Sequence, residues 1–177
     1  MELAKPLETV FNFLKLSISR YTKVYLVRGQ LEDIFNFLKL TNSVATAGQP
    51  TKKQLLLIKN AGYKVVVNLS PKTALNALPD EKEAVESLGM KYIHLPVDFN
   101  NPTMKDFDKF YRNMQENSQK PVFVHCAGNL RVSSFMYLYR RIHDGFSDEQ
   151  AQIELQKIWT PNKTWEQFIN QVIEREL

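Results

Sequence analysis

The sequence predicts an α/β fold with a central, mostly parallel sheet flanked by helices. The first reason is that strand-like and helix-like segments alternate from Ser43 onward, as they do when crossover helices join parallel strands. The second is the run Val65-Val66-Val67, whose continuous β-branched side chains are typical of a strand buried on both faces. At 177 residues, the chain is long enough for one domain with its own core and too short for two.

An internal repeat precedes the alternating region. Residues 7–17 recur almost unchanged as residues 31–41, and two copies are too few for a solenoid. We interpret the first copy as a duplicated leader and assign the second copy to the domain. The sequence thus predicts an N-terminal extension over residues 1–30, with a candidate strand at 23–27, and one domain over residues 31–177. The extension would pack on this domain or on a neighbouring molecule, and both alternatives stay open.

The first half of the domain is predicted to contain three strand-like and two helical segments. Gly62 lies just past the first helix, where a glycine commonly ends a helix, and Asp80 is expected to cap the second. In order, we predict an extended segment from Ser43 to Ala47, a helix from Thr51 to about Asn60, a strand from Tyr63 to Leu69, a helix to about Leu88 and a strand from Lys91 to Val97.

The second half is predicted to be mainly helical. Thr103 is expected to cap an amphipathic helix, and a strand ending at Cys126 leads into the next helix. Ser147 is expected to cap a helix that runs to about Trp159, and Pro161 introduces the last one. We expect these helices to bury their aromatic and aliphatic side chains, namely Phe107, Phe110, Tyr111 and Met114 in the first and Trp165, Phe168, Ile169 and Val172 in the last.

The candidate site lies where the apolar strand before Cys126 breaks into a short turn that opens a helix. Cys126 is the only cysteine of the chain, and the turn contains Gly128. Such a turn presents backbone N–H groups and the positive end of a helix dipole, which together bind an oxyanion and favour a nucleophilic thiolate. Arg131 supplies a planar, permanently charged fork for phosphate or sulfate oxygens.

The His-Cys turn and its surroundings resemble the cysteine-dependent protein tyrosine and dual-specificity phosphatases. Over Leu31 to the end, the chain is more closely similar to a small bacterial phosphatase-like family related to the domain fused to β-lactamase-hydrolase-type proteins. The resemblance implies a cysteine phosphatase-like fold for residues 31–177, a phosphate-binding loop after the last core strand, and neither metal nor cofactor. The segments that carry it are Ala45 to Pro50, Gly62 to Leu69, Gly89 to Val97 and Pro121 to Cys126.

The same resemblance implies a role for each residue of the turn. Cys126 would form a phosphocysteine intermediate, and His125 would hold the loop behind it and help to lower the pKa of the thiol. Backbone amides from Ala127, Gly128, Asn129 and Leu130 to Arg131 would cradle the phosphoryl oxygens, with the Arg131 side chain clamping two of them. Ser133 or Ser134 would donate a hydrogen bond to the departing sulfur. Asp98 lies where this fold usually keeps its general acid, and Asp106 is a fallback for that role.

The spacing between Cys126 and Arg131 departs from the phosphatase signature. The signature has five residues between cysteine and arginine, and this chain has four. One residue turns a side chain by about 100° around a helix, so turnover depends on where Arg131 lies. Two alternatives therefore stay open: a rhodanese-like sulfurtransferase, in which arginine commonly falls at the shorter distance, and a catalytically impaired module that binds phosphate or protein.

The composition limits the kinds of partner that we expect the chain to bind. With 44% hydrophobic and 24% charged residues, the chain has the composition of an ordinary globular protein. A net charge of +4 favours anionic ligands weakly, and no dense basic tract predicts nucleic-acid binding. No apolar run approaches the ~20 residues that span a bilayer, and a lone thiol suits a reducing compartment. We expect a cytoplasmic protein with a phosphorylated protein or small-molecule substrate, no nucleic acid and no membrane. The sequence leaves the substrate and the oligomeric state open.

Overall fold

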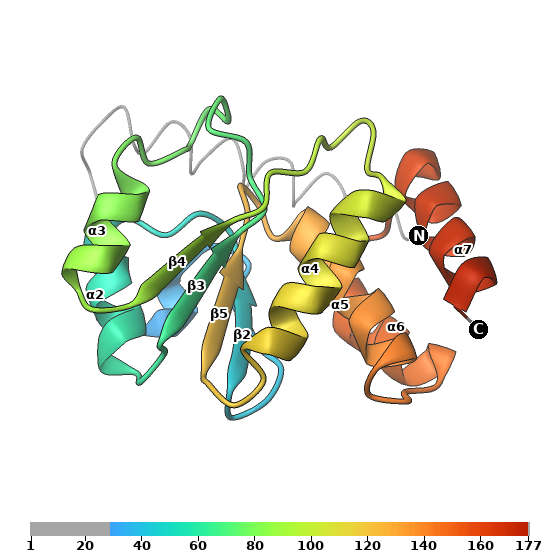
Figure 1. Ribbon diagram of the computed structural model, residues 1–177, viewed down its shortest axis with the longest axis horizontal. Coiled ribbons are helices and arrows are strands. Elements are labelled where there is room, and N and C mark those ends of the chain that lie inside the picture. The colour runs from blue at the N-terminus through green and yellow to red at the C-terminus, as the bar shows by residue number, and fades with distance from the viewer. Residues whose placement is uncertain (1–28, 177) are drawn as a thin grey trace, which may run out of the picture.

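The computed structural model describes residues 29–176, in which helices cover both faces of a five-stranded sheet (Figure 1). The strands lie in the order β1-β2-β5-β3-β4, with β1 antiparallel to β2 and the other three pairs parallel. The predicted fold class is therefore confirmed. The strands are β1 (Leu38–Lys39), β2 (Val44–Ala47), β3 (Val65–Asn68), β4 (Lys91–His94) and β5 (Val122–His125).

Strand β4 ends three residues earlier than the sequence predicts. The backbone N–H groups of Leu95 and Val97 still donate to the carbonyls of Asn68 and Leu69, at 2.9 and 3.1 Å. Pro96 between them has no N–H group to donate. The segment therefore continues alongside β3 without regular pairing, and it leads into the loop that carries Asp98.

The helices divide between the two faces of the sheet. Figure 1 shows α2 and α3 on one side and α4 to α7 on the other. A short 3-10 helix, η1 (Leu31–Asp33), precedes the sheet. The helices are α2 (Lys52–Asn60), α3 (Glu81–Ser87), α4 (Met104–Glu116), α5 (Leu130–Ile142), α6 (Asp148–Gln156) and α7 (Lys163–Glu176).

Three of the helices begin with a capping box. The side chains of Thr51, Thr103 and Ser147 each accept a hydrogen bond from the backbone N–H three residues later, as expected for Thr103 and Ser147. Asp80 occupies the N-cap position of α3, but the prediction that its side chain caps the helix is wrong. Its exposed carboxylate pairs with Lys52 at the start of α2 instead.

Two hydrophobic clusters fill the spaces between sheet and helices. Val122, Val124 and Cys126 belong to the cluster under α4 to α7, whereas Phe123 belongs to the cluster under α2 and α3. This division follows from the alternation of side chains along a strand. The predicted aromatic and aliphatic residues of the last helix are buried as expected, namely Trp165, Phe168, Ile169 and Val172.

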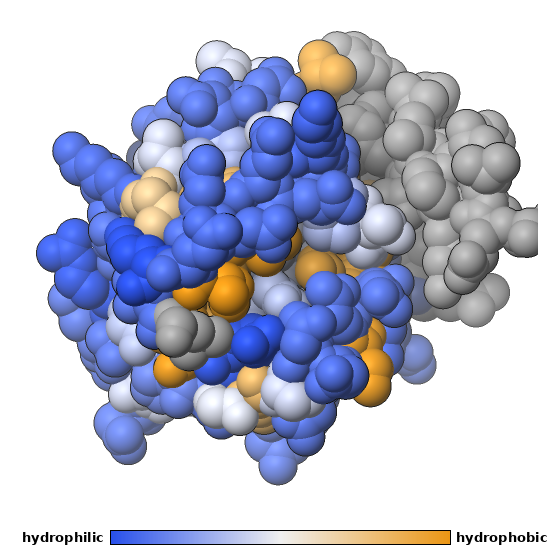
Figure 2. All heavy atoms as spheres, turned by 90° about the vertical axis from the view of Figure 1, so that its right-hand side faces the viewer, coloured by the Kyte–Doolittle hydropathy of each residue, from blue (hydrophilic) through white to orange (hydrophobic). Residues whose placement is uncertain are grey.

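The surface on the α7 side of the molecule is mainly hydrophilic, with small separate apolar areas (Figure 2). None of the helices in residues 29–176 combines the length and the apolar content that crossing a membrane requires. The second repeat copy forms η1, β1 and the turn between them. The first copy and the candidate strand at 23–27 lie outside the described residues.

Candidate active site

The candidate site lies at the carboxyl edge of the parallel strands. Three connections meet along this edge: residues 126–129 after β5, residues 69–80 after β3 and residues 95–103 after β4 (Figure 1). Ligands of open α/β sheets bind at this edge, since loops and helix N-termini converge there. The fold therefore places the His-Cys turn where a ligand is expected.

Two carbonyl groups of the turn accept hydrogen bonds from other segments of the protein, and a third accepts one from α5. The Ala127 carbonyl accepts from the Asn76 side-chain amide at 2.8 Å and from the Gln49 backbone N–H at 3.3 Å. The Gly128 carbonyl accepts from the Asn36 side chain at 2.9 Å. The carbonyl of Asn129 accepts from the Ser133 N–H at 2.9 Å. The outward direction of the carbonyls is thus fixed by contacts on several sides.

The amide groups of the turn consequently point the other way. In a trans peptide, the N–H is opposite the preceding C=O, so the N–H groups of Gly128 and Leu130 face away from those acceptors. In the described part of the chain, the backbone N–H groups of four residues donate to no carbonyl outside the helices and strands, namely those of Ala127, Gly128, Leu130 and Arg131. The side chain of Asn129, the N-cap residue of α5, caps no N–H group of the helix. These free donors and the helix dipole form a site for an anion.

Two asparagines with positive φ lock the turn in this shape. Asn129 has a φ of 68° and Asn36 a φ of 51°, values that asparagine adopts more readily than most residues. The Asn129 side chain donates to the Asn36 carbonyl at 2.7 Å and to the Thr46 hydroxyl at 2.9 Å. Because Asn36 in turn donates to Gly128, the second repeat copy supports the turn directly.

Gly48 allows β2 to approach the turn closely. A Cβ atom on this glycine would lie 2.9 Å from Cδ1 of Phe35 and 3.2 Å from the Ala127 carbonyl oxygen. Gly48 also forms an isolated bridge with Gly128. The need for glycine here is therefore steric and does not come from an unusual φ angle.

Cys126 and His125 are both fully buried at the end of β5. Cys126 packs within the cluster under α4 to α7, so a phosphoryl group has to enter the loop to reach the sulfur. His125 points into the opposite face, where its Nε2 lies 3.1 Å from Oε1 of Glu81. The role of His125 in holding the loop stays a prediction.

Arg131 has no acidic partner in the described part of the chain. Its guanidinium carbon lies 5.2 Å from the centre of the Phe99 ring, a distance typical of a cation–π contact, and its buried Nε has no hydrogen-bond partner. The side chain is half-buried and does not extend into bulk solvent. The guanidinium therefore lies beside the loop that carries Asp98, with no acidic side chain of residues 29–176 to compensate its charge.

Asp98 lies in the loop that borders the site, but its side chain is not directed to Cys126 by any contact. The exposed carboxylate accepts a hydrogen bond from the Asn100 N–H at 2.9 Å. The next residue, Phe99, packs on Arg131, and its carbonyl accepts from the Trp165 indole N–H at 2.9 Å. The loop is anchored beside the arginine, and the acid role of Asp98 stays a prediction. Asp106, the fallback acid, is held in the capping box of Thr103.

The two serines bond locally on α5, and their predicted role towards the departing sulfur stays a prediction. The hydroxyl groups of Ser133 and Ser134 both donate to the Leu130 carbonyl, at 3.0 and 3.1 Å. Neither bonds to the sulfur of Cys126 among the described contacts. On the first turns of a helix, serine hydroxyls commonly bond back to a carbonyl three or four residues earlier, and this local bond prevails here.

Sequence reasoning missed the polar residues that surround the turn. The missed residues are Asn36, Gln49, Asn68, Asn76, Glu81 and Tyr92. Each belongs to another segment, so the local pattern carries no sign of the contact. Among residues 29–176, no group of three or more His, Cys, Asp or Glu side chains has the arrangement needed to hold a metal ion.

Comparison with solved structures identifies phosphatases. A protein from Shewanella putrefaciens CN-32 described as "Putative phosphatase (DUF442)" is 31% identical, with a TM-score of 0.74 over 82% of this chain and 96% of that one. Tk-PTP is 21% identical, with a TM-score of 0.69 over 79% of this chain and 97% of that one. TpbA of P. aeruginosa, in complex with pTyr, is 17% identical with a TM-score of 0.59, covering 79% and 82% of the two chains. The last two likenesses concern the fold.

Comparison with family models gives the same result. None of the curated proteins compared with the chain is a match. A family model described as "DSP-PTPase phosphatase fused to NAD+ Kinase" matches residues 15–172, which is most of the chain. The resemblance stated from the four sequence segments is therefore confirmed. The chain belongs to this DSP-PTPase family, within the superfamily of protein tyrosine and dual-specificity phosphatases.

Proposed function

We propose that the protein hydrolyses phosphomonoesters, with phosphotyrosine as a candidate substrate, through a phosphocysteine intermediate on Cys126. The observation that carries this proposal is the pairing of an uncompensated Arg131 guanidinium with a turn whose free amides follow the cysteine. Both groups stabilise the charge that spreads over the phosphoryl oxygens during transfer. Family membership supports phosphoester hydrolysis in general, and the pTyr complex of the TpbA neighbour supports the candidate substrate.

The proposed reaction has two steps. The Cys126 thiolate attacks phosphorus, an S–P bond forms, and the bond from phosphorus to the substrate oxygen breaks. Asp98 gives its proton to the leaving oxygen, for which its loop is anchored beside Arg131 through Phe99. Water then attacks the phosphocysteine and gives one proton back to the Asp98 carboxylate, the S–P bond breaks, and phosphate leaves with the thiolate and the Asp98 acid restored.

An aryl-phosphate assay tests this function. We expect vanadate-sensitive hydrolysis that Cys126→Ser abolishes, because serine at this position is a far weaker nucleophile. Phosphate binding without turnover would instead identify a binding module. Formation of thiocyanate from thiosulfate and cyanide would identify a sulfurtransferase, and either result would overturn the proposal.

A further inference from the structure

The buried carboxylate of Glu81 takes no part in the two steps above. We propose that Glu81 is a positioning residue that fixes the orientation and charge of His125, and through it favours the thiolate of Cys126. This inference rests on the proposed function, since a thiolate matters only if Cys126 is the nucleophile. It adds a residue from α3, on the opposite face of the sheet, to the machinery of the site.

The geometry around Glu81 is that of a charge held by dedicated donors. Its Oε1 lies 3.1 Å from Nε2 of His125 and accepts from the Gln49 side-chain amide at 2.5 Å. Its Oε2 accepts from the Asn68 amide at 2.5 Å and from the Tyr92 hydroxyl at 2.9 Å. Glu81 is 4% exposed and His125 is fully buried. Carboxylates are almost never buried to this extent unless they are paired.

The electrostatics indicate that this carboxylate is ionised. Burial raises the pKa of Glu81, but the charge of His125, whose Nε2 lies 3.1 Å away, and the hydrogen bonds from Gln49 and Tyr92 outweigh it and lower that pKa to about 2. The donors Gln49, Asn68 and Tyr92 are neutral, and burial raises the pKa of Tyr92 further above its ordinary range. Among the groups in direct contact with Glu81, only His125 can supply a positive charge.

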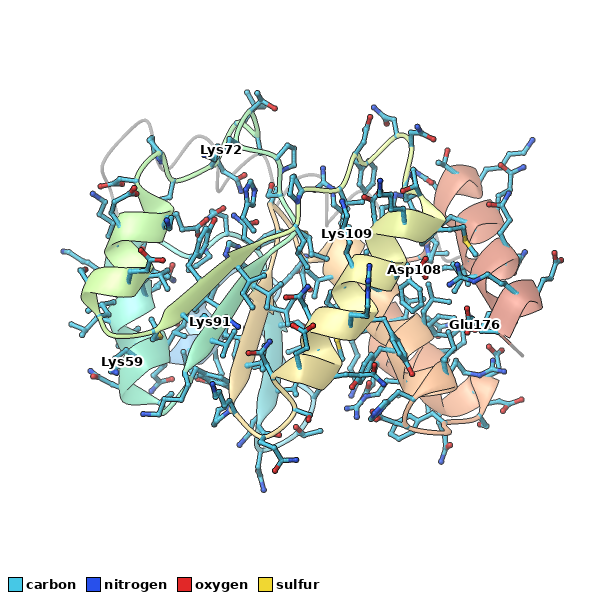
Figure 3. All side chains as sticks on the ribbon, viewed as in Figure 1. Lys59, Lys72, Lys91, Asp108, Lys109 and Glu176 are labelled. Carbon is cyan, nitrogen blue, oxygen red and sulfur yellow. The ribbon has the colours of Figure 1, made fainter. Side chains whose placement is uncertain are left out.

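Other charged groups lie farther from this pair. A cavity of about 280 Å³ borders Glu81 and is also lined by His94 on β4, by Glu83 and Lys82 on α3, and by Lys72 in the loop above β3. Figure 3 labels Lys72 in this loop, at the carboxyl edge of the sheet. None of these four groups forms a hydrogen bond or an ion pair with His125 in the described part of the chain. The carboxylate of Glu81 is therefore the dominant influence on the imidazole.

The effect reaches Cys126 through the chain itself. His125 pairs with Ala47 of β2 and Asn68 of β3, so the backbone on both sides of β5 is fixed. Cys126 is the next residue, with its side chain on the other face. A positive charge on His125 lowers the cost of ionising the neighbouring thiol. Removing the Glu81 charge should leave the imidazole without its ionic partner and make the thiolate harder to form.

Titration of the single thiol tests this inference without requiring turnover. Because Cys126 is the only cysteine, thiolate ultraviolet absorbance against pH, corrected with the matching Cys126→Ser chain, reports on one group. We expect Glu81→Gln to raise the pH of half-ionisation by about 1, and the matched control Glu83→Gln, an exposed carboxylate of the same helix, to leave it unchanged. An unchanged titration in folded Glu81→Gln would overturn the inference.

A second variant covers the case in which Glu81→Gln does not fold. Tyr92→Phe removes one donor from Glu81 and keeps the ring, so we expect a smaller rise in the same direction. Equal titrations of Tyr92→Phe and the unmodified chain would then count against Glu81. The two proposals can fail separately. If Glu81→Gln shifts the titration as expected but the unmodified chain hydrolyses no aryl phosphate, the proposed function is rejected and the action of Glu81 on the thiol stands.

Discussion

Arg131 differs from every other arginine of residues 29–176 in having no polar partner. Arg140 pairs with Glu154 and Asp144, Arg141 pairs with Asp148, and Arg175 pairs with Asp108. Arg112 donates to the backbone carbonyl of Asp108. A half-buried guanidinium that is stacked on a ring but not neutralised is suited to receive a dianionic group.

The substitution Arg131→Lys tests the clamp. A lysine keeps the charge but cannot make a two-point contact with phosphate oxygens, so we expect kcat/KM for an aryl phosphate to fall at least about tenfold, or about 1.4 kcal/mol. Arg141→Lys, which alters a surface ion pair, should leave the kinetics unchanged. Equal kinetics in Arg131→Lys and the unmodified chain would mean that Arg131 does not contact the substrate.

Glu81 also makes the stability of the protein depend on pH. Its pKa is about 2 in the folded protein and near 4.5 in the unfolded chain, so its contribution is complete above about pH 5 and is lost as pH falls towards 2. The full contribution is on the order of 3 kcal/mol. We expect the difference in unfolding free energy between the unmodified chain and Glu81→Gln to shrink between pH 6 and pH 3 in urea titrations.

The control for this measurement is Glu86→Gln. Glu86 is an exposed carboxylate on the same helix, and its ion pair with Lys82 is loose, at 4.0 Å. The unfolding free energy of Glu86→Gln should match that of the unmodified chain at both pH 6 and pH 3. A difference between the unmodified chain and Glu81→Gln that stays constant with pH would show that the carboxylate is not ionised in the folded state.

At the scale of elements, the start of α5 is built differently from the starts of α2, α4 and α6. Those three helices are capped by Thr51, Thr103 and Ser147, whereas the N-cap residue Asn129 uses its side chain to hold neighbouring segments. The turn before α5 is instead shaped by the close approach of β2 at Gly48. Stability of the turn is thus supplied by its neighbours, and its own donors remain free for a ligand.

The close approach at Gly48 predicts a cost for any side chain there. In Gly48→Ala, the new methyl group would press on Phe35 and on the Ala127 carbonyl, so we expect a loss of about 1–3 kcal/mol in unfolding free energy and weaker phosphate binding. Denaturant unfolding and phosphate titration would measure both. Gly29→Ala, at a glycine with nothing within 4 Å, should change neither. A fully stable, phosphate-binding Gly48→Ala chain would contradict this packing.

At the scale of the whole molecule, the last helix reaches the site through a chain of aromatic contacts. Trp165 of α7 donates its indole N–H to the Phe99 carbonyl, and the ring of Phe99 covers Arg131. The rings of Trp159 and Trp165 both lie within 6 Å of the Phe99 ring. Residues separated by 66 positions thereby fix the loop that carries Asp98.

Two tryptophan substitutions separate this hydrogen bond from packing. Trp165→Phe loses ring volume and the bond to Phe99, whereas Trp159→Phe loses ring volume only, because its indole nitrogen has no partner in the described structure. We expect Trp165→Phe to be about 1 kcal/mol less stable than Trp159→Phe and to lose roughly fivefold more in kcat/KM. Thermal unfolding and the aryl-phosphate assay measure these effects. Equal losses in both variants would mean that the bond does not position the loop.

Sequence patterns predicted most of the elements and the centre of the site. The valine run of β3, the caps Thr103 and Ser147 and the buried face of α7 were predicted because they depend on residues within one segment. The end of β4 and the partner of Asp80 were predicted incorrectly. Both depend on a neighbouring strand or helix.

The sequence by itself determined the α/β class, the position of Cys126 at the end of a strand and the presence of an arginine at the opening of the next helix. These features follow from periodicity and spacing along the chain. Only the tertiary structure decided that Arg131 is left without an acidic partner, that the turn is held by Asn36 and Asn76, and that Glu81 faces His125. Such contacts join segments that are distant in sequence, and they exist only once the sheet has brought its edge loops together.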